Sequence, residues 1–270
     1  MIIGGKEFDF GDHFYIMGIL NVTPDSFSDG GRYTDMDKAL FQVERLVEDG
    51  ADILDIGGES TRPEYIEITA EEEIKRVCPI INRIKKSFDI PVSLDTYKSD
   101  VAMAGIEAGV DMINDIWGLK WDGTMAEVIA KADIPCCLMH NRRHGAYRDV
   151  VEDVLEDLKQ CIDMALQAGI AAGNILLDPG IGFAKDVNQN LLLMKHLSRI
   201  CELGYPVLLG TSRKSMIGLT LDLPVEEREE GTLATSVMGL MAGCSVFRVH
   251  DVRTNFRGLK MAEAIMKAGS

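Results

Sequence analysis

The segment GTSRKSMIG, residues 210–218, combines two adjacent cations with small and hydroxyl-bearing residues. Thr211 and Ser212 can cap a helix that begins just after them. Lys214 and Ser215 would then lie near the start of that helix, where amide groups and the helix dipole favour an anion. The spacing therefore predicts an anion-binding loop, and the alternative is an exposed basic turn.

A second cationic segment is FRVHDV, residues 247–252, which has the pattern of a strand end. In a strand, Arg248 and His250 would share a face, because side chains alternate. An arginine can contact two phosphate oxygens at once, so the pair indicates a phosphate-binding cluster. The alternative is a buried Arg248 paired with Asp251.

Acidic and amide side chains stand at the ends of three other apolar runs: Asp95, Asn114 and Asp178. On neighbouring strands of a barrel these side chains would converge inside its mouth. Uncompensated buried carboxylates are costly, so the group predicts a ligand rich in N–H donors, such as a 2-amino-4-oxopterin ring. A metal held by the carboxylates is the alternative, and Asn114 counts against it.

Another apolar run ends at Asn21, within the segment GILNVTPDSFSDGG at residues 18–31. The neutral side-chain oxygen of Asn21 suits Mg²⁺, which prefers oxygen ligands and usually keeps waters and phosphates as partners. The alternative for Asn21 is a turn or strand-end cap. The rest of this segment is too long for a simple turn and predicts a mobile lid.

Strand-like and helix-like segments alternate through the chain and would position these residues. The eight short apolar runs are 14–20, 52–56, 90–94, 110–113, 134–139, 174–177, 205–209 and 245–249. Helical spacing of apolar residues occurs at 37–49 and 149–168. Glycines that can cap helices precede several runs: Gly50, Gly109, Gly169, Gly204 and Gly243. Eight repeats favour an α/β fold of the (β/α)8 TIM-barrel type over a doubly wound sheet. Residues 1–270 fit one such domain, with residues 1–13 capping the bottom of the barrel.

The composition narrows the classes of partner. A formal net charge of −15 disfavours nucleic acid, which binds clustered cations. No run approaches the length of a membrane span, and the first ten residues lack a signal-peptide pattern. The six scattered cysteines form no Cys-x-x-Cys pair, which predicts buried reduced thiols in a cytoplasmic protein.

The motifs together resemble those of the dihydropteroate synthases, which are pterin-binding TIM-barrel enzymes. In order they are GILNVTPDSFSDGG, DIGGESTRP, SLDTYKSDVA, INDI, LMH, LDPGIGFAKD, GTSRKSMIG and FRVHDV. The resemblance implies a transferase of folate biosynthesis that joins 6-hydroxymethyl-7,8-dihydropterin pyrophosphate to p-aminobenzoate and releases pyrophosphate. It also implies a homodimer, and the Met- and Leu-rich helix expected at about 226–243 is a candidate interface, unless it only packs on the barrel.

The resemblance further implies roles for individual residues. The pterin pocket would comprise Asp95, Asn114, Asp178 and Lys214. The pyrophosphate contacts would be Thr61, Arg62, Arg248 and His250, with Mg²⁺ near Asn21. The p-aminobenzoate wall would comprise Phe27, Pro63, Phe183, Lys214 and Ser215. Catalysis would fall to Lys214, Arg248 and His250.

The sequence departs from the family pattern in two loops. Glu64 follows Arg62-Pro63, and HNRRHGAY at 140–147 lacks a Gly-x-Pro after LMH. These changes concern loop shape and substrate affinity more than the chemistry. A corrinoid-type methyltransferase, a non-catalytic pterin-binding homologue and a phosphate-binding aldolase are alternatives. The cations at Lys214 and Arg248 count against the first two, and the loop position of Lys214 counts against the third.

Overall fold

A computed structural model describes residues 1–11, 13–22, 35–59, 67–143 and 146–269. Eight parallel strands form one sheet in the order β8-β7-β6-β5-β4-β3-β10-β9. The strands are β3 (Tyr15–Asn21), β4 (Ile53–Gly57), β5 (Val92–Asp95), β6 (Met112–Asp115), β7 (Cys136–Met139), β8 (Ile175–Asp178), β9 (Leu208–Leu209) and β10 (Val246–Val249). A parallel bridge between Leu177 and Val207 joins the two ends of this order, so the sheet closes into a barrel. The predicted fold class and all eight predicted strands are confirmed.

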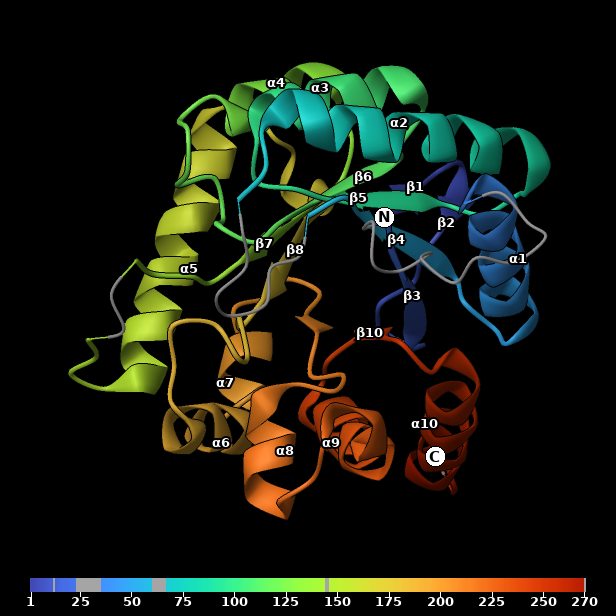
Figure 1. Cartoon of the computed structure of the whole chain (residues 1–270). Helices are drawn as coiled ribbons and strands as arrows, with labels where there is room; N and C mark the ends of the chain where they lie inside the picture. The colour runs from blue at the N-terminus through green and yellow to red at the C-terminus, as the bar shows by residue number, and fades with distance from the viewer. Residues whose placement is uncertain (12, 23–34, 60–66, 144–145, 270) are drawn as a thin grey trace.

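Helices surround the strands on the outside of the barrel (Figure 1). They are α1 (Asp35–Glu48), α2 (Ala70–Ser87), α3 (Ser99–Ala108), α4 (Met125–Ala132), α5 (Val150–Gln167), α6 (Val187–Lys195), α7 (Ser198–Cys201), α8 (Ser215–Leu221), α9 (Glu229–Ala242) and α10 (Val252–Met266), with 3-10 turns at Ala172–Asn174 and Val225–Glu227. The segments 37–49 and 149–168 correspond to α1 and α5, as predicted. All five predicted capping glycines have positive φ angles, from 83° to 105°. No described helix is long and apolar enough to cross a membrane.

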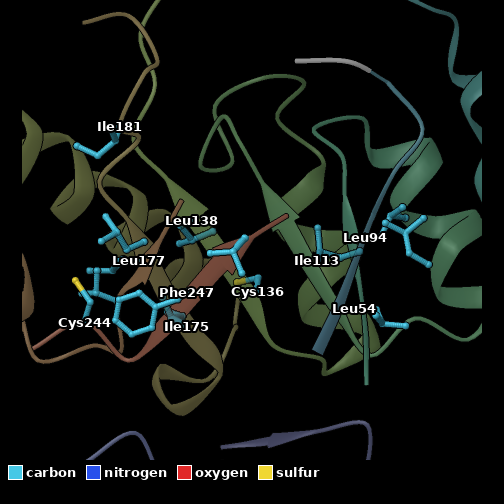
Figure 2. Packing of buried hydrophobic residues seen from close by; sticks show 14 of the residues in the cluster. Leu54, Leu94, Ile113, Cys136, Leu138, Ile175, Leu177, Ile181, Cys244 and Phe247 are labelled. Carbon is cyan, nitrogen blue, oxygen red and sulfur yellow. The ribbon is translucent and has the colours of Figure 1, made fainter. Parts of the chain in front are cut away.

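Alternation along each strand divides the buried side chains between two cores. The larger core lies between the strands and the helices and includes Leu54, Ile113 and Cys136 (Figure 2). The smaller core fills the barrel interior and includes Ile53, Met112 and Cys137. The adjacent Cys136 and Cys137 therefore point to opposite faces of β7, because side chains alternate along a strand.

The N-terminal segment forms a hairpin that contributes to the smaller core. Strand β1 (Ile2–Ile3) pairs antiparallel with β2 (Lys6–Glu7). The turn between them is Gly4-Gly5, with φ angles of 59° and 79°. Positive φ at both central residues is what a type I′ hairpin turn requires. Ile3 and Phe8 then pack against the interior residues of the barrel, so the predicted cap is confirmed for the described part of residues 1–13.

Candidate active site

The carboxyl ends of four neighbouring strands place polar residues at one level. The parallel register pairs Asn21 with Gly57, Gly57 with Asp95, and Asp95 with Asn114. Residues paired across a sheet project from the same face, so three predicted site residues form one row. Gly57 lacks a side chain and leaves room in this row: a Cβ there would lie 3.8 Å from Asn21 Oδ1 and 3.8 Å from Asp95 Oδ2.

Arg248 joins this row from the other side of β3. Its Nε donates to Asp55 Oδ2 at 2.6 Å, and its Nη2 donates to Asp95 Oδ2 at 2.6 Å. Asn114 Nδ2 donates to the same Asp55 oxygen at 3.3 Å. Arg248 is thus ion-paired, but with these carboxylates rather than with Asp251, which instead accepts from Thr254 N at the start of α10.

Sequence reasoning missed Asp55, a fully buried carboxylate at the centre of this cluster. It lies inside the apolar run DILDI, two residues after Ile53 and on the same face of β4. A charged residue at an inward-facing position of a buried strand was the signal that could have revealed it.

Three oxygens of the cluster accept no hydrogen bond from any residue that the structure describes: Asp55 Oδ1, Asp95 Oδ1 and Asn114 Oδ1. Buried polar atoms in folded proteins are nearly always hydrogen-bonded, so three neighbouring acceptors require donors. Burial raises the pKa of Asp95 to about 7, although the Arg248 charge opposes this shift. The cluster therefore suits a ligand that presents several N–H groups.

Lys214 and Asp178 lie next to Gly210, on the same side of it as the Cβ of Arg248. A Cβ at Gly210 would lie 3.8 Å from Asp178 Oδ2 and 3.9 Å from Lys214 Nζ. Burial lowers the pKa of Lys214 to about 8, and the Asp178 charge opposes this shift. Burial raises the pKa of Asp178, and Lys214 opposes that shift. A cation and a carboxylate thus stabilise each other beside the unpartnered acceptors.

Phe183 is also brought to Lys214, as the sequence predicts for one wall of the site. The Lys214 ammonium lies 4.6 Å from the centroid of the Phe183 ring and donates to the backbone oxygen of Ile181. Such a cation over an aromatic face is attracted by the ring quadrupole. Phe183 also packs against the buried cluster of Tyr97, Ile116 and Met139, so it forms an apolar edge next to the charged cluster.

The loop before α8 differs from the prediction in one respect. Helix α8 begins at Ser215 as expected, but Thr211 and Ser212 do not cap it. The Thr211 hydroxyl bonds to Thr235 Oγ1 at 2.8 Å, and Ser212 Oγ lies 2.9 Å from His250 Nδ1. The prediction of capping was wrong because partners distant in sequence take both hydroxyls. The Ser212 contact links the two cationic segments, although His250 itself follows the end of β10.

The other sequence candidates are placed as follows. Among the described residues, no group of three His, Cys, Asp or Glu side chains could hold a metal ion. Asn21 thus offers one neutral oxygen, which fits Mg²⁺ only where a ligand and waters supply its other contacts.

His140 is a packing residue hydrogen-bonded to Asp157 and Lys185. Outside the described residues lie Phe27, Thr61, Arg62, Pro63 and Glu64, with most of the predicted lid and the centre of the 140–147 loop.

Comparison with known families gives the class of protein. The model of a family described as pterin binding enzyme matches residues 17–250, which is most of the chain. The barrel and its cluster of buried acceptors agree with this match, and the chain belongs to that family.

Individual relatives narrow the family further. The dihydropteroate synthase of Clostridium beijerinckii is 60% identical over 99% of this chain and 100% of the relative. That of Bacillus subtilis is 52% identical over 94% of this chain and 89% of the relative. A Clostridium difficile dihydropteroate synthase solved with pteroic acid has a TM-score of 0.93 and 48% identity, covering 96% of this chain and 99% of its own. Within the pterin-binding enzymes, the chain belongs with the dihydropteroate synthases, which are transferases.

Proposed function

We propose that this chain condenses 6-hydroxymethyl-7,8-dihydropterin pyrophosphate with p-aminobenzoate to give 7,8-dihydropteroate and pyrophosphate in folate biosynthesis, working as one domain over residues 1–270. The observation that carries the proposal is the set of buried acceptors on Asp55, Asp95 and Asn114 beside the cation of Lys214. A pterin ring presents amino and ring N–H donors together with a carbonyl acceptor, so it complements both features.

In this proposal the pterin ring occupies the cluster. The amino group and the ring N–H groups face Asp178 and the unpartnered oxygens of Asn114 and Asp95. Lys214 is then positioned to donate to an acceptor on the ring. Because its pKa is lowered only to about 8, Lys214 remains mainly charged near neutral pH.

The reaction breaks the bond between the pterin methylene carbon and the pyrophosphate oxygen, and it forms a bond from that carbon to the amine of p-aminobenzoate, which loses a proton. Catalysis requires contacts that strengthen as charge gathers on the departing oxygen. Arg248 uses only part of its N–H donors in its ion pairs, so others remain for this oxygen. His250, Thr61 and Arg62 are proposed as the further pyrophosphate contacts.

Mg²⁺ is proposed as an accompanying ion, held by Asn21 and by oxygens of the substrate. When bound, it would offset the charge of the leaving pyrophosphate. We expect excess chelator to weaken binding of the pterin pyrophosphate, measured by calorimetry, while binding of the pterin alcohol without pyrophosphate stays unchanged. Equal affinity for the pyrophosphate with and without chelator would remove Asn21 from this role.

The p-aminobenzoate is proposed to lie against Phe183, with Ser215 and Lys214 near its carboxylate and Phe27 and Pro63 completing the wall. Phe183 supports this placement because its ring lies next to Lys214 at the edge of the cluster. A Xanthomonas albilineans dihydropteroate synthase solved with 4-aminobenzoic acid has a TM-score of 0.91 and 42% identity to this chain, which supports the choice of co-substrate.

The experiment that tests this function follows pyrophosphate release from the purified protein with the pterin pyrophosphate, p-aminobenzoate and Mg²⁺. We expect release that depends on p-aminobenzoate, together with formation of dihydropteroate. Tight pterin binding without any release would overturn the proposal, and would favour a methyltransferase or a non-catalytic pterin-binding protein.

A homodimer in the cytoplasm completes the proposal. Large apolar side chains are exposed on α9 and α10, including Met238 at 53%, Met241 at 69% and Met261 at 61% exposure, which supports an interface there. All six cysteines are free thiols, which supports a reducing compartment. Light scattering should give twice the 29.7 kDa mass of one chain, and a single-chain mass would contradict the dimer.

A further inference from the structure

The loop at residues 179–186, called here the Phe183 loop, follows β8 and is held by one side chain of its own. We propose that Lys185 is a positioning residue, whose ammonium fixes this loop against the end of β7 and so sets the place of Phe183 for p-aminobenzoate. The inference rests on the proposed function, in which Phe183 forms a wall of the p-aminobenzoate site.

The Lys185 ammonium has three hydrogen-bond partners around it. Its Nζ donates to the backbone oxygen of Gly180 at 2.8 Å and to that of Phe183 at 3.1 Å, and it lies 2.9 Å from His140 Nδ1. An ammonium group has three N–H donors, so these contacts use all of them. Two partners belong to the Phe183 loop and the third follows β7, which makes Lys185 a cross-link between loop and barrel.

The third partner is itself held in place. His140 Nε2 lies 3.1 Å from Asp157 Oδ2 on α5, and Arg142 Nε donates to the same oxygen at 2.5 Å. Because the ionised Asp157 carboxylate only accepts hydrogen bonds, Nε2 carries the donated proton, and Nδ1 then accepts from Lys185 Nζ. Burial lowers the pKa of His140 to about 4, although Asp157 opposes the shift, so the neutral ring is the form present near neutral pH.

Backbone contacts show that the Phe183 loop fits its surroundings closely. Gly180 has a φ of 68°, and a Cβ there would lie 2.0 Å from the backbone oxygen of His140. Gly182 has a φ of 83°, and a Cβ there would lie 2.8 Å from Lys214 Cδ. Ala184 also has a positive φ, 49°, which is unfavourable for a residue with a side chain. Such a conformation persists only where surrounding contacts hold it.

A second set of contacts ties the loop to α6. Asn190 Oδ1 accepts from Gly182 N at 2.7 Å, and Asn190 Nδ2 donates to the backbone oxygen of Lys185 at 3.2 Å. These contacts would remain if the Lys185 side chain were shortened or made apolar. Loss of the Lys185 ammonium should therefore free the Phe183 loop from His140 at the end of β7, while Asn190 still holds the loop to α6. Phe183 should then move relative to Lys214.

Within the described part of the chain, no carboxylate accepts a hydrogen bond from the partly buried Lys185. Burial lowers its pKa to about 7, and the charge of Asp178 opposes that shift. A cation in such a place contributes less to stability than an ion-paired lysine would. This agrees with a role in setting loop geometry rather than in holding the barrel together.

The test compares Lys185→Met, Lys185→Arg and the control Lys195→Met, which removes an exposed lysine from α6. For Lys185→Met we expect the KM for p-aminobenzoate to rise about tenfold or more, because misplacing a contact by about 1 Å can have large effects. Pterin binding measured alone by calorimetry should change by less than about threefold, since Asp55, Asp95 and Asn114 lie outside the Phe183 loop and Asn190 still holds Gly182 beside Lys214. Lys185→Arg should recover part of the KM, and Lys195→Met should match the wild type.

A purely structural role would lower the fraction of folded enzyme, and thus kcat, without changing KM. An unchanged KM for p-aminobenzoate in Lys185→Met, or an equal rise in Lys195→Met, would overturn the proposal. If Lys185→Met does not fold, Lys185→Arg carries the same KM test. A wild-type enzyme that releases no pyrophosphate would instead contradict the proposed function, so the two failures are distinguishable.

Discussion

The two ends of the barrel interior are built from the same strands but differ in chemistry. At the amino-terminal end, Ile53, Met112, Leu176 and Val246 form a dry apolar layer with Ile3 of the hairpin. The residues two positions further along these strands are Asp55, Asn114, Asp178 and Arg248. Since residues two apart share a face, one step of about 7 Å along the strands leads from apolar packing to the candidate site.

This difference separates stability from function within one fold. Ile3, Ile53, Met112, Leu176 and Val246 in the apolar layer are fully buried and carry no hydrogen-bonding group. On β5 the same level is occupied by Ser93, whose buried hydroxyl neither accepts nor donates a hydrogen bond among the described residues. The polar layer buries three acceptors without described donors, which is unfavourable until a ligand supplies them. Substitutions at the first layer should therefore lower stability, and substitutions at the second should lower activity.

The largest expected effect is at the polar layer. Lys214→Ala should lower kcat/KM by about 100-fold or more, as loss of a preorganised charge at a reaction centre usually does. The melting temperature should fall much less than the activity, because the cost of burying the ammonium offsets part of the stabilisation that Lys214 and Asp178 give each other. Initial rates and thermal unfolding measure the two quantities, with Lys131→Met on the exposed surface of α4 as the control. Near-normal activity would exclude Lys214 from the proposed machinery.

The second expected effect is at the apolar layer. Ile3→Ala should lower the free energy of unfolding by about 2–4 kcal/mol, because it leaves a cavity among fully buried side chains. The KM values of the folded enzyme should not change. Urea unfolding and steady-state kinetics check both points.

Ile2→Ala is the matched control for that experiment, since Ile2 is on the same short strand but is 56% exposed. Its effect should stay within about 0.5 kcal/mol. Equal losses of stability in Ile2→Ala and Ile3→Ala would contradict the assignment of Ile3 to the apolar layer. A changed KM in Ile3→Ala would contradict the separation of stability and activity between the two layers.

Local features of the sequence were enough to predict the strands and the capping glycines. Each strand is a short apolar run, and each predicted cap depends on one glycine such as Gly109, whose φ is 105°. The bounds of most strands differ from the predicted runs by one or two residues, and β9 differs most in length. The run 205–209 contains Pro206, which has no N–H, and the strand is limited to Leu208–Leu209. Barrel closure at Leu177 and Val207 followed from the number of repeats.

The pairing of side chains in the site could not be predicted in the same way. Arg248 is 193 residues from Asp55 and 153 from Asp95 in sequence, so no local spacing indicates these ion pairs. The same reason explains Thr211 and Ser212, whose hydroxyls bond to residues of α9 and the end of β10 instead of capping α8. The residue types at the strand ends predicted that these polar side chains gather at one end of the barrel. They did not predict which atoms form the ion pairs and hydrogen bonds.

The smallest expected effect is the pH dependence of stability that Asp95 contributes. Its pKa is raised by burial from 3.8 to about 7, so between these values the folded protein binds more protons than the unfolded chain. The contribution of Asp95 to stability is therefore complete below about pH 4 and is lost as pH rises through about 7. The slope cannot exceed about 1.4 kcal/mol per pH unit, and the nearby Arg248 should reduce it.

Asp95→Asn removes the titrating carboxyl group. The contribution of Asp95 is therefore measured as the difference in unfolding free energy between this variant and the wild type at each pH. The free energy of unfolding of the variant minus that of the wild type should rise from pH 5 to pH 7 and level off above about pH 8. Other titrating groups, including His140, largely cancel in this difference. Exposed Asp89 gives the control, because Asp89→Asn should yield a difference that is nearly flat over the same range. A flat difference for Asp95→Asn as well would contradict this prediction. It would mean that the Asp95 carboxylate is as well stabilised at the polar end of the barrel as in water. The contrast between the two layers would then not extend to Asp95.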